Sequence, residues 1–242
     1  MKSFIAWMGG KRLLANQIIE RFPNDIDRYI EVFGGGGSVL FRKNKLELEV
    51  YNDLNSDLVN LFRCAKYHSG ELQREISGYL NSREIFDEIK AKMNVSGFTD
   101  IQRAGMFYIL NKISYGSNMR TFGGRKRNLS GEYLSEISER LKDVVIENLD
   151  FERLIKKYDH PKALFYCDPP YSSTERYYES VFKHDDHERL RTVLGEIQGK
   201  FILSYNDSQY IRELYKDFEI ATTERQNNLS KGLYKELIIK NF

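Results

Sequence analysis

The sequence has few of the residues that would point to a metal or disulfide protein. Only two of its 242 residues are cysteines and four are histidines. Cys64 and Cys167 are far apart and lack the spacing of metal ligands, and the histidines form no HxH or HExxH pattern. We therefore predict no metal site, and two isolated cysteines fit a reducing compartment.

Long apolar runs and an excess of one charge are also missing. No stretch approaches the ~20 apolar residues of a membrane-spanning helix, and MKSFIAWMGGKRLL lacks the apolar core of a signal peptide. We therefore expect a cytoplasmic protein with no membrane partner. The formal net charge of +2 permits a nucleic-acid partner without predicting one, so a basic surface would have to come from local clustering.

What the sequence does contain is an alternation of strand and helix patterns. Ala15, Ile18, Ile19 and Phe22 follow the spacing of an amphipathic helix. Short apolar runs that predict strands occupy residues 28–33, 46–52, 143–151, 163–168 and 200–207, and a helix with an Asp185-x-x-Glu188 start signal precedes the last of these. Residues 218–225 and 234–242 predict an antiparallel pair at one edge. The pattern is that of a doubly wound α/β sheet.

The middle of the chain departs from this alternation. Residues 54–92 have helical patterns, whereas residues 95–127 lose the rhythm and gain Gly, Asn, Ser and Arg. We predict that 1–55 and 144–242 form the sheet domain and that 56–143 is an inserted, mostly helical lobe. Such an insert usually recognises the substrate, although extra packing is the alternative.

Four glycines, Gly34 to Gly37, follow the first predicted strand. They would let a ligand approach the backbone, as in sites for NAD, ATP or S-adenosylmethionine. The P-loop pattern is absent, and a dinucleotide pattern would need glycine where Val39 or Leu40 stands. A nucleoside without a pyrophosphate fits best, with Asp53 at the end of the second strand accepting bonds from ribose hydroxyls. The alternatives are a flexible surface turn and, for Asp53 with Asn55, a helix cap.

The stretch ALFYCDPPYSS places an acid, two prolines and an aromatic ring after a buried strand. Asp168 could cap a following helix, and the prolines could simply end the strand. Alternatively, Asp168 and the rigid backbone carbonyl beside it could accept two hydrogen bonds from an exocyclic amino group, while Tyr171 stacks on a flipped base.

These motifs resemble the Dam-like DNA adenine N6-methyltransferases of the α class, also called D12-type. The resemblance rests on AWMGGKRLL, EVFGGGGSVLF, YNDLNSD, CDPPY and YKELIIKNF, in that order. It implies a Rossmann-like sheet, a target-recognition lobe, S-adenosylmethionine as cofactor and double-stranded DNA as partner. The implied cofactor site comprises Trp7, Lys11, Glu31, Phe33, Gly34, Gly35, Gly36, Asp53, Asp150, Phe151 and Asp168. The implied site for the target base comprises Asp168, Pro169, Pro170 and Tyr171.

The best candidate for DNA contact is LNKISYGSNMRTFGGRKRN, residues 110–128. The resemblance implies target recognition here, and Asn111, Tyr115, Asn118 and Arg120 echo the family's pattern. A solvated basic loop is the alternative. The residues that we expect to bind DNA are Lys112, Tyr115, Asn118, Arg120, Arg125, Lys126 and Arg127.

Two departures from the family pattern limit the prediction. KISYGSNM differs from the motif of GATC-recognising members, so their recognition sequence is not transferred. LSYND also differs from the usual strand end, which leaves Asn206 and Asp207 as secondary candidates. Alternative acceptors of the methyl group are cytosine N4, an RNA base and a glutamine amide. A DNA-binding regulator without catalytic activity is the alternative class of protein. We expect a monomer or weak dimer, and a cognate restriction endonuclease is a further candidate partner.

Overall fold

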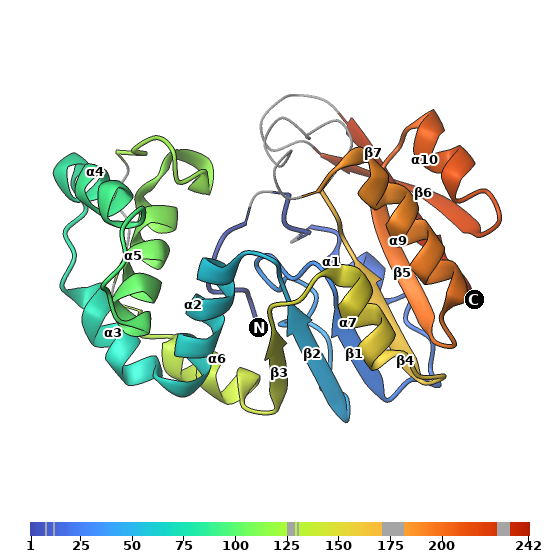
Figure 1. The fold of residues 1–242 in the computed structure, drawn as a ribbon, viewed down its shortest axis with the longest axis horizontal. Helices are drawn as coiled ribbons and strands as arrows, with labels where there is room; N and C mark the ends of the chain where they lie inside the picture. Colours follow the sequence, from blue (N-terminus) through green and yellow to red (C-terminus); the bar gives the residue numbers. More distant parts are fainter. Residues whose placement is uncertain (8, 12, 125–128, 130, 171–181, 227–232) are drawn as a thin grey trace.

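In the computed structural model, seven strands form one sheet in the order β3-β2-β1-β4-β5-β7-β6 (Figure 1). The structure describes residues 1–7, 9–11, 13–124, 129, 131–170, 182–226 and 233–242. Strands β1 to β5 pair in parallel, and β7 pairs antiparallel with both β5 and β6. The strands are β1 (Arg28–Glu31), β2 (Leu48–Asn52), β3 (Val144–Glu147), β4 (Ala163–Cys167), β5 (Lys200–Asn206), β6 (Glu219–Gln226) and β7 (Leu233–Lys240). The predicted α/β class and the antiparallel C-terminal pair are confirmed.

Helices cover both faces of this sheet. The described helices are α1 (Ala15–Ile19), α2 (Ser56–Tyr67), α3 (Ser69–Ser77), α4 (Arg83–Lys92), α5 (Asp100–Ile113), α6 (Leu134–Leu141), α7 (Phe151–Tyr158), α9 (His184–Glu196) and α10 (Gln209–Leu214), with a short 3-10 helix η1 (Tyr115–Ser117). Figure 1 shows α3, α4 and α5 beyond the β3 edge of the sheet, with the β6–β7 hairpin at the opposite end.

The alternation of side chains along the strands divides the core into two layers. Tyr29, Leu164, Tyr166, Ile202 and Ile238 lie on one face and pack with residues of α1, α2 and α6. The neighbouring residues along the same strands lie on the other face and pack with residues of α7, α9 and α10. The sheet is therefore buried on both sides, which explains why its central strands read as continuous apolar runs.

The segment predicted as an inserted lobe contains helices α2 to α6 and lies in the chain between β2 and β3. Because β2 and β3 are neighbours in the sheet, the insertion leaves the strand order intact. One core cluster runs from the sheet residue Tyr51 through Phe62 of α2 to Phe86 of α4. The lobe is thus packed onto the sheet through α2 and is not connected to it by a linker alone.

The structure corrects three local predictions. The first helix ends at Ile19, short of Phe22. Helix α9 is capped by Asp186, whose carboxylate accepts from the Lys183 N–H at 2.7 Å, and not by the expected Asp185-x-x-Glu188 pair. The third concerns α5, a 14-residue helix within residues 95–127, for which the loss of the strand and helix rhythm gave no particular element although the lobe as a whole is predicted to be mostly helical.

Helix α5 was missed because it is buried on nearly all sides. Every residue from Ala104 to Asn111 is buried, so the helix lacks the polar stripe that normally identifies one. Its start does carry a local signal, since Thr99 and Gln102 form a capping box with bonds of 3.3 and 3.0 Å.

Candidate active site

The predicted site residues follow the carboxyl ends of the parallel strands, which meet at one edge of the sheet. Strands β1 and β4 are neighbours although β2 and β3 separate them in the chain, so the strand order reverses between them. Ligands bind at this reversal point in open α/β sheets, because the connections leave in opposite directions and open a crevice.

The glycine loop after β1 is fixed and buried, and so is not a flexible surface turn. The Gly34 N–H donates to the Asn52 carbonyl at 2.7 Å, and the Tyr51 hydroxyl donates to the Gly35 carbonyl at 2.7 Å. A Cβ on Gly34 would lie 2.8 Å from the same Asn52 oxygen, and one on Gly35, where φ is +48°, would lie 2.6 Å from the Trp7 ring. Only glycine fits at these two positions.

Asp53 and Asn55 have separate roles. Asn55 caps α2 by accepting from the Leu58 N–H at 3.0 Å, so the capping alternative applies to Asn55. Asp53 instead joins the loops that follow β1 and β2, since its carboxylate accepts from the Gly35 and Asn55 N–H groups, each at 2.8 Å. Burial raises the pKa of Asp53, while the backbone N–H groups oppose that shift.

Asp168 lies directly after β4 and is tied to two other segments of the chain. Its Oδ1 accepts from the Lys11 ammonium at 2.5 Å and from the Ser204 hydroxyl at 3.1 Å. No described residue donates to Oδ2, and the side chain keeps 17% of its surface exposed. Burial raises the pKa of Asp168, whereas the charge of Lys11 lowers it. The carboxylate is therefore oriented by one oxygen, with the other available to a ligand.

Glu31, the last residue of β1, is turned beneath the glycine loop. Its carboxyl accepts from the Leu40 N–H at 2.8 Å and from the Tyr29 hydroxyl at 3.0 Å, and it is almost fully buried. Burial raises the pKa of Glu31 to about 8. The bond to Leu40 shows that Glu31 supports the segment that follows the loop.

Three aromatic rings stand beside the glycine loop, around the start of α7. The centroids of Phe33, Phe151 and Phe182 lie 5.7 Å apart in each pair. Asp150 caps α7 and accepts from the Arg189 guanidinium at 2.8 and 2.9 Å. The predicted pair of Asp150 and Phe151 is thus brought next to Phe33, although Phe182 and Arg189 had not been predicted.

A polar row crosses the same face of four neighbouring strands, and the sequence analysis missed two of its members, Ser204 and Glu236. Glu31 of β1, Ser204 of β5 and Glu236 of β7 are buried, and Asp168 follows β4. Glu236 stood out only as the single acid in the apolar run of the last strand. Its place near Asp168 depends on the pairing of β5 with β7, a contact between residues far apart in the chain.

The predicted DNA-contacting segment begins at the end of α5 and turns back through η1. Asn111 is buried and donates to the Ala6 carbonyl at 2.9 Å, so it connects the N-terminal segment to this turn. Asn118 accepts from the N–H groups of Arg120 and Thr121 at 2.8 and 3.1 Å. Tyr115 is 60% exposed and Arg120 is also exposed.

Lys112 has a different environment, because its ammonium lies 5.1 Å from the Tyr108 ring centroid and 5.7 Å from that of Tyr133. Asp207 pairs with Arg212 at 2.7 Å, which lowers the pKa of Asp207. Four predicted residues lie outside the described part of the chain: Tyr171, Arg125, Lys126 and Arg127.

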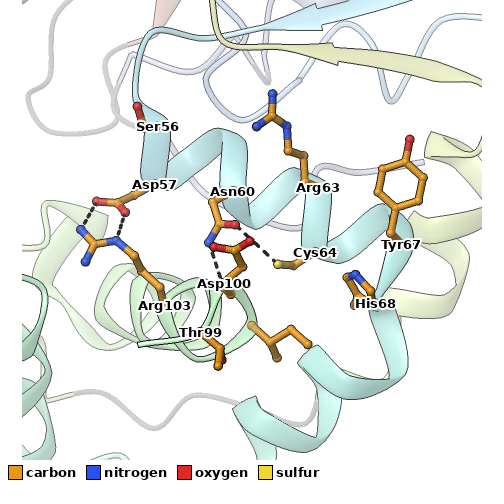
Figure 2. Close-up of a pocket in the computed structure, with 11 residues that line it drawn as sticks. Ser56, Asp57, Asn60, Arg63, Cys64, Tyr67, His68, Thr99, Asp100 and Arg103 are labelled. Atoms are coloured by element: carbon orange, nitrogen blue, oxygen red, sulfur yellow. Dashed lines mark hydrogen bonds and ion pairs between the residues drawn. The ribbon is translucent and has the colours of Figure 1, made fainter. Parts of the chain in front are cut away.

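A separate hollow of about 570 Å³ lies on the outer side of α2, where α5 begins (Figure 2). Asp57 and Arg103 form a two-bond ion pair within it, at 2.5 and 3.1 Å. Arg63 and Tyr67 extend from α2, the helix that also carries Asp57. None of the predicted site residues lines this hollow.

The sheet order places the fixed glycine loop and the oriented acid at the strand reversal, where open α/β sheets bind their ligands. Comparison with known proteins makes this specific, because residues 7–229 match the family described as D12 class N6 adenine-specific DNA methyltransferase. The chain belongs to this family, whose members transfer a methyl group to the N6 amino group of adenine in DNA.

Similarity to individual relatives spans the whole chain. It is 30% identical to the type II methyltransferase M.MjaIII of Methanocaldococcus jannaschii, over 100% of this chain and 99% of that protein. It is 26% identical to the type II methyltransferase M1.LlaDCHI of Lactococcus lactis subsp. cremoris, over 100% and 96%. It is 24% identical to a DNA adenine methylase of Haemophilus influenzae, over 99% and 91%.

Among the residues that the structure describes, no helix is long and apolar enough to cross a membrane. No group of three or more His, Cys, Asp or Glu side chains there is arranged to hold a metal ion.

Proposed function

We propose that the methyl donor is S-adenosylmethionine and that it binds where β1 and β2 end. The support is a loop in which Gly34 and Gly35 leave no room for side chains, beside a carboxylate, Asp53, that can accept bonds from ribose hydroxyls. Phe33 and Phe151 offer apolar faces to the adenine, with Asp150 next to them. The proposed cofactor site also includes Trp7, Lys11, Glu31 and Gly36. When bound, the cofactor supplies an electrophilic methyl group on a sulfonium.

The target adenine is proposed to lie against Asp168, and this oriented carboxylate is the observation that carries the proposal. Oδ2 of Asp168 and the backbone carbonyl that follows it would accept the two N–H groups of the amino nitrogen, which directs its lone pair toward the methyl group. Pro169 and Pro170 restrict the backbone at this point. Tyr171 is proposed to stack on the flipped base.

Asp168 acts mainly as an orienting acceptor in this mechanism. Alignment of the reacting atoms and a crevice of low dielectric constant would supply the rate. Lys11 and Ser204 hold Oδ1, so the carboxylate does not need to reorganise when the base arrives. The amino group releases one proton after or during transfer.

We propose residues 56–143 as the lobe that recognises double-stranded DNA, with residues 1–55 and 144–242 carrying out catalysis. The support is the exposed turn after α5, which presents Tyr115 and Arg120 on a backbone fixed by Asn118. Phosphate contacts position a protein on DNA, and contacts to base edges specify the sequence. The remaining proposed DNA contacts are Lys112, Arg125, Lys126 and Arg127.

The cellular setting is also a proposal. Two of the relatives are named type II methyltransferases, which supports a cytoplasmic role in restriction and modification beside a cognate endonuclease. The protein is proposed to act as a monomer or weak dimer.

The test is to incubate the purified protein with S-adenosylmethionine labelled on the methyl group and with genomic DNA free of methylation. The DNA is then digested to nucleosides, and the modified positions are mapped by sequencing. We expect label in N6-methyladenosine within one short motif, and no label with an Asp168→Asn variant. Transfer by that variant at the wild-type rate would refute the proposed site.

A further inference from the structure

Glu236 is a buried acid that the mechanism above does not use. It lies in β7 opposite Asn206 of β5, and only 1% of its surface is exposed. A glutamate in such a position is rare unless a cation or hydrogen-bond donor compensates for the loss of water. The residue therefore calls for a specific role in this part of the sheet.

One compensating cation is Lys11. Its Nζ lies 3.9 Å from Oε1 of Glu236 and 2.5 Å from Oδ1 of Asp168, and the lysine side chain is only 2% exposed. Lys11 comes from the segment before α1, Asp168 from the end of β4 and Glu236 from β7. The ammonium thus lies between two carboxylates from separate elements, which restricts its position.

The charges of this triad also suit the reaction. Two carboxylates and one ammonium give the triad a formal net charge of −1. A sulfonium in the adjoining crevice carries +1, and this positive charge moves onto the amino nitrogen as the methyl group is transferred. Fixed groups that face such a charge contribute to the rate because they need no reorganisation.

We propose that Glu236 is a positioning residue for methyl transfer: it holds the Lys11 ammonium against Oδ1 of Asp168, and thereby presents Oδ2 to the target amino group. This inference rests on the proposed function of Asp168. Glu236 acts through Lys11, since it is the lysine that contacts Asp168. Ser204 supports the same oxygen from β5.

The test is a double-mutant cycle with Glu236→Gln, Lys11→Met and the two combined. We expect Glu236→Gln to lower kcat by about tenfold, as small misplacements of reacting groups do, with KM for DNA and cofactor unchanged within twofold. In the Lys11→Met background the same change should lower kcat less than twofold, because the residue that it positions is gone. Glu236→Asp, which keeps the charge, should recover part of the rate.

Glu219→Gln is the matched control, because it removes one negative charge from the same hairpin. Glu219 pairs with Lys240 at 3.2 Å and its side chain is 60% exposed, so we expect wild-type kcat. Thermal melting monitors folding in every variant. If Glu236→Gln alone does not fold, Lys11→Met with Glu236→Leu replaces the buried pair by apolar groups, a change that proteins often tolerate. This double variant should then lose as much rate as Lys11→Met alone.

Two results would overturn the inference. The first is wild-type kcat in folded Glu236→Gln, and the second is equal losses from that change with and without Lys11. Failure of the proposed function is distinguishable, because it would appear as full activity in Asp168→Asn whatever Glu236 does.

Discussion

The strand-end crevice and the turn after α5 are built in different ways. In the crevice, the side chains of Asp53, Asp168 and Glu31 are bonded to other parts of the protein and are largely withdrawn from water. In the turn, Asn118 fixes the backbone by accepting from the N–H groups of Arg120 and Thr121, whereas the side chains of Tyr115 and Arg120 are exposed.

This difference follows from what each region has to meet. A small ligand requires its partners in fixed places, and a preorganised site avoids reorganisation during the reaction. A DNA duplex covers a broad surface, and long exposed side chains can reach phosphates and base edges on it. Substitutions in the crevice should therefore affect rate or cofactor binding, and those in the turn should affect DNA binding.

The largest effect is expected from Asp168→Asn. The amide keeps the shape of the side chain but replaces one acceptor by a donor, so the target amino group meets a mismatched partner. We expect kcat to fall on the order of 10³-fold, with folding retained. Single-turnover methyl transfer measures the rate, and calorimetric titration with the cofactor serves as the control. If the variant lost only DNA affinity, the prediction that crevice residues act on the rate and turn residues on DNA binding would be contradicted.

A smaller effect is expected from Asp53→Asn. Hydrogen bonds to a charged group contribute about 1.5–3 kcal/mol, so cofactor affinity should fall by roughly one order of magnitude or more. DNA affinity should not change. Calorimetry with S-adenosylmethionine and fluorescence anisotropy with a labelled duplex test the two halves of this prediction. An equal loss of cofactor affinity and DNA affinity would show that Asp53 also supports the inserted lobe.

The sequence alone predicted the parts of the site that each directly follow a predicted strand. The glycine loop directly follows β1, Asp53 follows β2 and Asp168 follows β4, so local patterns placed all three at one edge of a parallel sheet. Their roles in binding and catalysis stay predictions.

The remaining site residues could not be predicted from the sequence, because their positions depend on pairing between distant segments. Ser204 and Glu236 come near Asp168 only because β5 and β7 lie beside β4 with a particular register. Helix α5 was missed for a related reason, since its burial within the lobe removes the polar stripe. Arg189, which binds Asp150, comes from α9 and had no local signal.

On the other side of the comparison, Arg120→Ala should weaken DNA binding. A guanidinium that reads a base contributes about 1–3 kcal/mol of discrimination, and one that binds phosphate should instead weaken all sequences alike. Anisotropy titrations over a range of salt distinguish these outcomes, and cofactor affinity should stay constant. Lys45→Met is the control. Lys45 is also an exposed cation, but it precedes β2 and so lies at the amino ends of the strands, opposite the carboxyl ends where the site residues lie. Unchanged DNA affinity in Arg120→Ala would remove this residue from the interface.

The smallest effect concerns the cost of burying an acid under the glycine loop. The folded protein raises the pKa of Glu31 from 4.5 to about 8, so it binds this proton more tightly than the unfolded chain does. The contribution of protonated Glu31 to the free energy of unfolding is fully present below about pH 4.5, and it is lost as the pH rises through about 8. Glutamine cannot ionise, so Glu31→Gln should avoid that loss.

We expect the Glu31→Gln variant to melt near the wild-type temperature at pH 5 and a few degrees above it at pH 8.5. The amide can still accept from the Leu40 N–H, which limits other changes to the loop. Thermal melting of both proteins without cofactor at the two pH values is the measurement. A variant that melts lower at pH 8.5 would mean that the ionised carboxylate stabilises the loop, so that the crevice gains stability from its buried charge.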